Sequence, residues 1–223
     1  MGTGLLGLLR SDPLLFVLLS ASLLAAISLH EFGHALAADL QGDRLPRAMG
    51  RVTLNPAKHL DPLGTIFIFL VGFGWGKPVE FRANALSSRR FGAALVALAG
   101  PAMNLLLALG GAFAFGLLAD PVSGAVAQRF GALSSSASTG ARFAFLFTSI
   151  NVLLAVFNLI PLPPLDGSRL LTIFLPPSRQ NVIFFLDRYG MLILLGLLIF
   201  GGFAVIEPLL ALVSRIAFSI AAF

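Results

Sequence analysis

The sequence predicts an all-α polytopic membrane protein: a bundle of five to six transmembrane or membrane-embedded helices with a short β segment on the cytoplasmic side. Only 11% of the 223 residues are charged, 57% are hydrophobic, and the mean hydropathy is +0.94. A soluble domain carries about a quarter charged residues. Several long runs, such as residues 13–29 and 91–119, contain no ionisable group, and a spanning helix needs about 20 mainly apolar residues. Because these runs are far longer than barrel strands, helices are the expected spanning elements.

Apolar runs and the residues that interrupt them place the individual elements. Asp12 followed by Pro13 is typical of a helix start, since Asp caps free amides and Pro fits the first turn. Arg51–Leu54 is predicted to be a short strand, and Glu207-Pro208 a break between the last two helices. The segment 62–76 is short for a span, so it either crosses as a tilted helix or enters and leaves on one side. The expected helices cover residues 12–39, 62–76, 91–118, 141–160, 187–206 and 209–223.

One domain and one orientation follow from this order. Residues 1–223 are expected to form a single membrane domain, with a core at about 12–170 and C-terminal helices at 187–223. Both polar loops beside the segment 62–76 are basic, and basic loops face the cytoplasm. This places residue 166 on the cytoplasmic side, in a multi-pass protein of the cell membrane. The lipid bilayer is therefore an expected partner, while nucleic acid is not, because there is no basic run. No feature specifies an oligomeric state.

The motif H-E-x-x-H ends the first predicted helix, with His30, Glu31 and His34. Residues four apart share a helical face, so both imidazoles can reach one Zn²⁺. Glu31, next to the first histidine, can contact water at the metal. A chance match is the alternative, but ionisable residues inside a membrane helix are candidates for function. Since the chain has no Cys, any further ligand must offer nitrogen or oxygen.

A third protein ligand is needed, because catalytic zinc usually has three ligands and a water molecule. The candidates are His59 and the carboxylates, and Asp166 is the best of them. The prolines of segment 161–164 stiffen the approach to it, and Gly167 permits a tight turn after it. The alternative is that Asp166 is an ordinary loop aspartate or a helix cap.

Two of these motifs together resemble a known family. "HEFGH" followed by "NLIPLPPLDG" is similar to the site-2 protease family of intramembrane zinc metalloproteases, peptidase family M50. "AGPAMN" resembles the family's helix motif between the two, and "LNPAKHLDPLG" and "GWGKPVEF" resemble its compact branch without a PDZ domain. The resemblance implies one Zn²⁺ held by His30, His34 and Asp166, with Glu31 as general base. It also implies hydrolysis of peptide bonds within or next to transmembrane segments of membrane-protein substrates, in regulated intramembrane proteolysis.

Three further polar residues have open roles. Asn104 and Asn158 are candidates to hold the substrate backbone or the oxyanion, while packing between helices is the alternative for Asn104. Asn151 shares a helical face with Asn158 and is expected to pack. His59 is expected to have a structural role or to support the ligands from behind, rather than to bind the metal.

Two other functions fit parts of the pattern. A metal transporter would need polar residues along a path through several helices, and the outer halves of the first three long helices offer almost none. A non-catalytic zinc-binding membrane scaffold or chaperone would not need the general base, yet every residue expected for catalysis is present.

Overall fold

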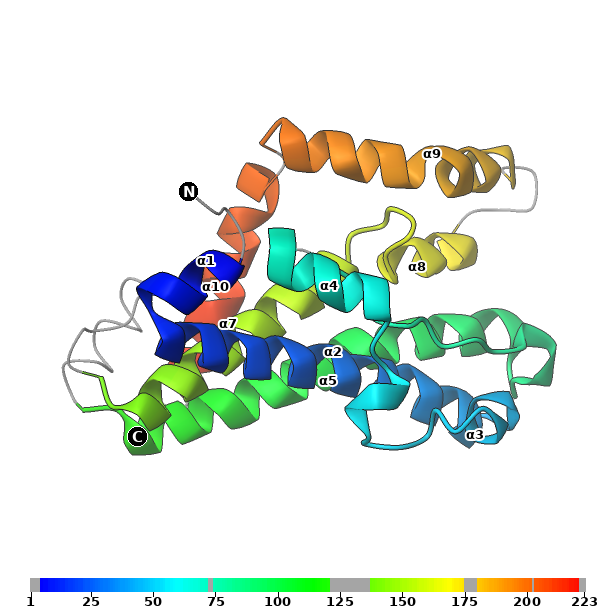
Figure 1. The fold of residues 1–223 in the computed structure, drawn as a ribbon. Helices are drawn as coiled ribbons and strands as arrows, with labels where there is room; N and C mark the ends of the chain where they lie inside the picture. Colours follow the sequence, from blue (N-terminus) through cyan, green and yellow to red (C-terminus); the bar gives the residue numbers. More distant parts are fainter. Residues whose placement is uncertain (1–4, 72–73, 121–136, 175–179, 202, 221–223) are drawn as a thin grey trace.

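The computed structural model describes residues 5–71, 74–120, 137–174, 180–201 and 203–220, and most of these residues lie in helices. No strand occurs among these residues, so the all-α class is confirmed for them (Figure 1). The helices are α1 (Leu5–Ser11), α2 (Pro13–Leu40), α3 (Leu45–Ala48), α4 (Pro62–Val71), α5 (Arg89–Leu118), α7 (Thr139–Asn158), α8 (Gly167–Phe174), α9 (Gln180–Ile199) and α10 (Phe203–Ile220).

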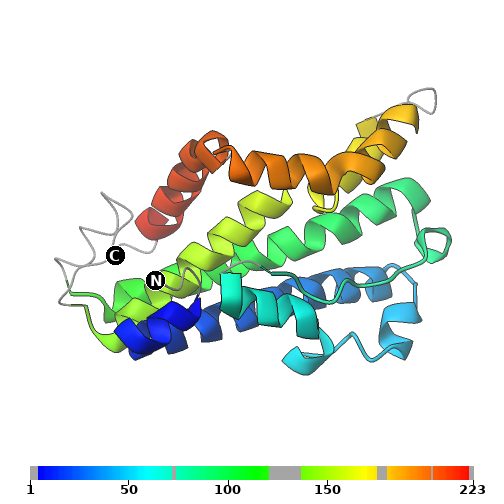
Figure 2. The same ribbon diagram turned by 45° about the horizontal axis from the view of Figure 1, so that its top comes forward.

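Three long helices, α2, α5 and α7, lie side by side and form the core of the molecule (Figures 1 and 2). Each is long and apolar enough to cross a membrane. Small side chains such as Ala108, Ala112 and Ala144 line the contact between α5 and α7, next to Phe115 and Phe145. Small residues let membrane helices approach closely, which supplies van der Waals contact where lipid gives no hydrophobic driving force.

The described residues of the segment 62–76, which are 62–71 and 74–76, begin and end on one side of the structure. Its helix α4 has 10 residues and is about 15 Å long at 1.5 Å per residue, half the roughly 30 Å of a hydrocarbon core. An antiparallel bridge joins Leu60 to Gly76, and the amide of Lys77 donates to the carbonyl of His59 over 2.7 Å. Because its two ends are paired, the segment does not reach the opposite side of the bundle.

The strand expected at Arg51–Leu54 does not form, and the segment contains bends instead. Its arginine side chain is buried and donates to the carbonyls of Lys58 and Lys77. The His59 ring donates from Nε2 to the carbonyl of Thr53 over 2.7 Å. Bonds from side chains to the backbone therefore take the place of a strand ladder here.

The C-terminal helices differ from the prediction in their limits. The chain turns at Gly201, whose φ of 85° is left-handed, and not at Glu207-Pro208. Pro208 lies inside α10, near its start, where the missing amide costs few helical hydrogen bonds. Figure 1 shows α9 lying apart from the three core helices; its Leu194 packs on Leu162 and Leu165 of the loop before α8.

Candidate metal centre

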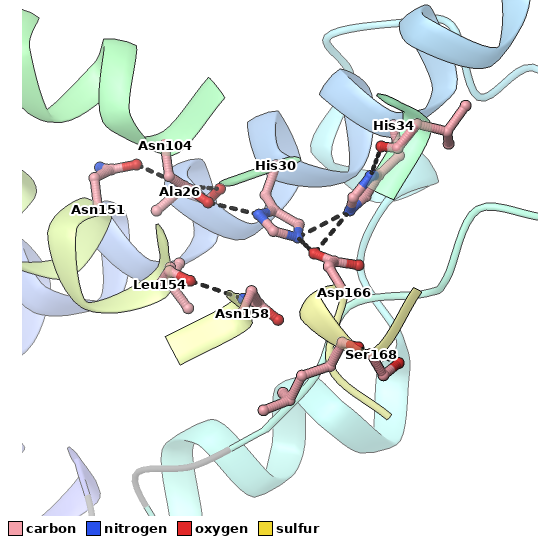
Figure 3. Close-up of polar contacts among 11 residues, drawn as sticks. Ala26, His30, His34, Asn104, Asn151, Leu154, Asn158, Asp166 and Ser168 are labelled. Carbon is pink, nitrogen blue, oxygen red and sulfur yellow. Dashed lines mark hydrogen bonds and ion pairs between the residues drawn. The ribbon is translucent and has the colours of Figure 1, made fainter. Parts of the chain in front are cut away.

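Three potential ligands from two distant parts of the chain converge beside the core helices (Figure 3). His30 and His34 lie on α2, and Asp166 lies in the loop between α7 and α8. Asp166 Oδ2 is 3.0 Å from His30 Nε2 and 3.2 Å from His34 Nε2. The two Nε2 atoms are 3.0 Å apart. The residues predicted to share a site are therefore in contact.

These separations fit a tetrahedral zinc site. With ligand distances of about 2.0–2.1 Å, tetrahedral geometry places two ligand atoms about 3.3 Å apart. The three measured separations lie between 3.0 and 3.2 Å. A small outward movement of each side chain would admit the ion.

The hydrogen bonds behind the imidazoles assign their protons. His34 Nδ1 is 2.7 Å from the carbonyl oxygen of Val96, which only accepts, so Nδ1 donates and Nε2 keeps a lone pair. His30 Nδ1 is 2.5 Å from Asn104 Oδ1. Asn104 Nδ2 donates to the carbonyl of Ala26 over 3.2 Å, so the amide oxygen must be the atom that faces His30. His30 therefore also donates from Nδ1 and presents a lone pair at Nε2.

The carboxylate completes a set of three acceptors. Asp166 adds a carboxylate oxygen, which only accepts when it is ionised. Asp166 Oδ2 is buried and has no hydrogen-bond partner among the described residues. Two nitrogen lone pairs and an ionised oxygen thus face one another, and a divalent cation stabilises such a group.

Gly100 of α5 provides the room for both rings. A Cβ at this position would lie 2.4 Å from His34 Nε2 and 2.7 Å from His30 Cε1. Any side chain here would displace the imidazoles, so the "AGPAMN" motif has a steric reason for its glycine. Glycine permits such close approach of a backbone to a site.

Glu31 lies next to the ligands and is half-buried. Within the described part of the chain, no hydrogen bond engages its carboxylate. The backbone of Gly76 crosses close by, since a Cβ there would lie 3.1 Å from Glu31 Oε1. Burial lowers the pKa of the Arg51 guanidinium. The negative charges of Glu31 and Glu80 attract the guanidinium and partly oppose this lowering. The arrangement leaves a free carboxylate beside the ligand atoms.

The other predicted polar residues are placed differently. Asn104 is fully buried and its carboxamide is fully engaged, which favours a role in holding His30 over contact with a substrate. Asn158 is half-buried and donates to the carbonyl of Leu154 in its own helix over 2.9 Å. In Figure 3, Asn158 and Asp166 both lie on the side of the His30 ring that faces away from Asn104.

His59 lies away from the ligands, within the polar loop before α4. Its side chain is fully buried, and burial lowers its pKa. Sequence reasoning assigned Asn151 to packing, but its Oδ1 accepts from Asn104 Nδ2 over 2.8 Å. A polar amide in an apolar helix was the only signal, since pairing between α5 and α7 is not visible in spacing along one helix.

Comparison with known proteins agrees with this geometry. The family model of Peptidase family M50 matches residues 18–201. "Putative zinc metalloprotease YwhC" of Bacillus subtilis (strain 168) is 36% identical over 180 residues, which cover 80% of this chain and 78% of the relative. "Putative zinc metalloprotease Rip2" of Mycolicibacterium smegmatis is 36% identical over 194 residues, covering 82% of this chain and 67% of the relative. No solved structure matches the chain significantly.

The family match covers most of the chain and includes α2 from residue 18 onward, the three ligand candidates and the loop that carries Asp166. Two helices able to cross a membrane lie within the same region, and a third enters it, starting at Pro13. The chain therefore belongs to peptidase family M50, the site-2 protease family of zinc metallopeptidases.

Proposed function

We propose that this protein is an intramembrane zinc protease that hydrolyses peptide bonds within or next to transmembrane segments of membrane-protein substrates. One Zn²⁺ would be held by His30, His34 and Asp166. The convergence of two imidazole nitrogens and one carboxylate oxygen within 3.2 Å of one another carries the proposal. The names of the relatives, which are zinc metalloproteases, support it.

The depth of the site supports cleavage inside the membrane. His30 lies about 26 Å along α2 from Pro13, at 1.5 Å per residue, and the hydrocarbon core is roughly 30 Å thick. The site would therefore lie just inside one boundary. The neighbouring loops are rich in Lys and Arg, so this boundary is the cytoplasmic one in a multi-pass protein of the cell membrane.

The chain's own residues divide the work of the reaction. Bound zinc supplies Lewis acidity toward the scissile carbonyl and toward water. Glu31 takes the proton from the attacking water and passes it to the leaving amine. Its carboxylate is suited to this because no described residue forms a hydrogen bond with it. The carboxamide of Asn158 holds the substrate backbone near the site. Asn104 and Val96 keep the two imidazoles oriented from behind.

Two variants test this assignment. Glu31→Gln keeps the shape and all three ligands, so the purified variant should bind zinc with a 1:1 ratio as the wild type does. Cleavage of a model transmembrane peptide should fall by a factor of about 10²–10⁴, the usual contribution of a general base. Asp166→Ala should lose both zinc and cleavage. A Glu31→Gln protein that cleaves at the wild-type rate, or a wild type without zinc, would contradict the proposal. A scaffold or chaperone would keep its activity in Glu31→Gln.

The orientation can be tested with single cysteines, because the natural chain has none. Leu54 is exposed in the loop that follows α2, at the end of α2 that carries the candidate ligands, and Thr139 is exposed at the start of α7, at the end of that helix remote from Asp166. In intact cells, a membrane-impermeant maleimide should label Thr139→Cys, and should label Leu54→Cys only after lysis. The reverse pattern would place the site on the outer face.

A further inference from the structure

Two buried asparagines connect the candidate metal centre to α7 (Figure 3). Asn104 on α5 and Asn151 on α7 are both 0% exposed. Asn104 bonds His30 on α2 over 2.5 Å, and Asn151 bonds Asn104 over 2.8 Å. A single series of hydrogen bonds thus runs through all three core helices and ends on a ligand candidate.

The direction of every bond in this series is fixed by backbone carbonyls. Asn151 Nδ2 donates to the carbonyl of Phe147 over 2.8 Å, so its oxygen must face Asn104. Asn104 Nδ2 donates to that oxygen and to the carbonyl of Ala26, so its own oxygen must face His30. Carbonyls cannot donate, and a rotation of either amide by 180° would set like atoms against one another. The series therefore accepts a hydrogen bond from His30 Nδ1 and cannot donate one to it.

We propose that Asn151 is a positioning residue of the metal site: through Asn104 it holds His30 in the tautomer whose Nε2 lone pair faces Asp166. This rests on the zinc site proposed above. A purely structural role in holding α5 against α7 would require only that the two amides bond each other. The observed series does more, because its last acceptor selects one of the two ring nitrogens of His30.

The expected size of the effect follows from the place of each residue. Loss of a group that orients a metal-binding histidine typically lowers metal affinity 10–100-fold. Asn104→Leu removes the direct partner and should weaken zinc binding by this amount. Asn151→Leu leaves Asn104 Nδ2 with the carbonyl of Ala26 as its one remaining partner while Oδ1 still faces His30, so we expect a loss of about 10-fold, near the lower end of that range.

The chain offers an unusually direct readout, because it contains only three histidines. In metal-free protein labelled with ¹⁵N-histidine and reconstituted in lipid, solid-state NMR resolves the protonated and unprotonated ring nitrogens of each. The wild type should show His30 and His34 protonated on Nδ1, while His59 is protonated on Nε2 by its bond to Thr53 and serves as an internal reference. Asn151→Leu should populate the other tautomer of His30 alone.

Two variants separate positioning from general stability. Asn151→Asp is isosteric, and burial favours its neutral carboxyl, which can accept from Asn104 and donate to Phe147; it should restore both the tautomer and the zinc affinity. Thr148→Val is the matched control, since Thr148 is equally buried on α7 but, among the described residues, bonds only the carbonyl of Ala144 in its own helix. It should retain wild-type zinc affinity in competition with a chelator of known strength.

Each outcome decides one question. Wild-type tautomer and zinc affinity in Asn151→Leu would overturn the proposal, as would an equal loss of affinity in Thr148→Val. A wild type that binds no zinc would overturn the proposed function, while the tautomer of His30 in metal-free protein would still test the positioning by Asn151.

Discussion

Replacement of Gly100 by alanine tests whether the helix contact shapes the metal site. The added Cβ would lie 2.4 Å from His34 Nε2, whereas ordinary contact begins at 3.4 Å. The ring would have to move by about 1 Å, about five times the tolerance of roughly 0.2 Å in a metal–ligand distance. Zinc affinity should therefore fall more than about 100-fold, beyond the 10–100-fold typical of changes behind a ligand.

The fold should survive this change. An extra methyl group in a packed interior costs about 1–3 kcal/mol, but alanine in a helix gains about 1 kcal/mol over glycine. The net loss of stability is thus at most about 2 kcal/mol, so Gly100→Ala should still be purified as a folded protein. This separates loss of the site from loss of the structure.

The measurement is zinc content after dialysis against graded concentrations of a chelator, together with the thermal unfolding midpoint in detergent. Gly110→Ala is the matched control, because it lies on the same helix and a Cβ there meets nothing within 4 Å. It should keep wild-type zinc affinity. Wild-type affinity in Gly100→Ala would refute the reasoning, since it would mean that the rings do not lie against α5 when zinc is bound.

Two further predictions concern the polar loop. Asp43 is fully buried and accepts from Arg82 at the backbone N (2.5 Å), Nε (3.0 Å) and Nη2 (2.7 Å); Asp43→Asn should lower the free energy of unfolding by about 1.5–3 kcal/mol. Burial raises the pKa of Asp43, but the Arg82 bonds outweigh it and hold that pKa below its ordinary value. This stabilisation is therefore complete above pH about 4 and is lost as the pH falls further. The melting temperatures of the wild type and Asp43→Asn should converge in acid, and a constant difference would contradict this. Burial lowers the pKa of His59, so its neutral form stabilises the loop fully above pH about 6.5, and this is lost as the pH falls through the lower folded pKa. The Lys77 amide bonds the His59 carbonyl, so its protection against hydrogen exchange, relative to the intrinsic rate at each pH, should fall in acid more in the wild type than in His59→Gln.

The long helices were predictable because the membrane imposes their length. α2, α5 and α7 begin and end within two residues of the expected limits. The C-terminal helices were displaced because α9 begins with polar residues, among them Asn181, Asp187 and Arg188, which leave no hydropathy edge. Pro208 then gave a false boundary, since its cost depends on how far into a helix it lies.

The candidate site was predictable only where one segment carries its own chemistry. H-E-x-x-H is local to a helix, and Asp166 follows a recognisable run of prolines. The series from Asn151 to His30 depends on which faces of α2, α5 and α7 meet, and the approach of Gly76 to Glu31 depends on the return of the α4 segment. Neither relation is encoded in spacing along one helix.

The same contacts hold the helices together and orient the ligands. Asn104 bonds α2 through both Ala26 and His30, while Val96 of α5 bonds His34. A displacement of α5 against α2 would therefore release both imidazoles at once, and each freed ring could rotate or change tautomer. A metal–ligand distance tolerates a change of only about 0.2 Å, whereas a folded domain is stable by several kcal/mol. Small packing changes at this contact will therefore lower the zinc affinity well before they unfold the protein. The helix contact, together with the three ligand candidates, thus sets how tightly the proposed site can bind zinc.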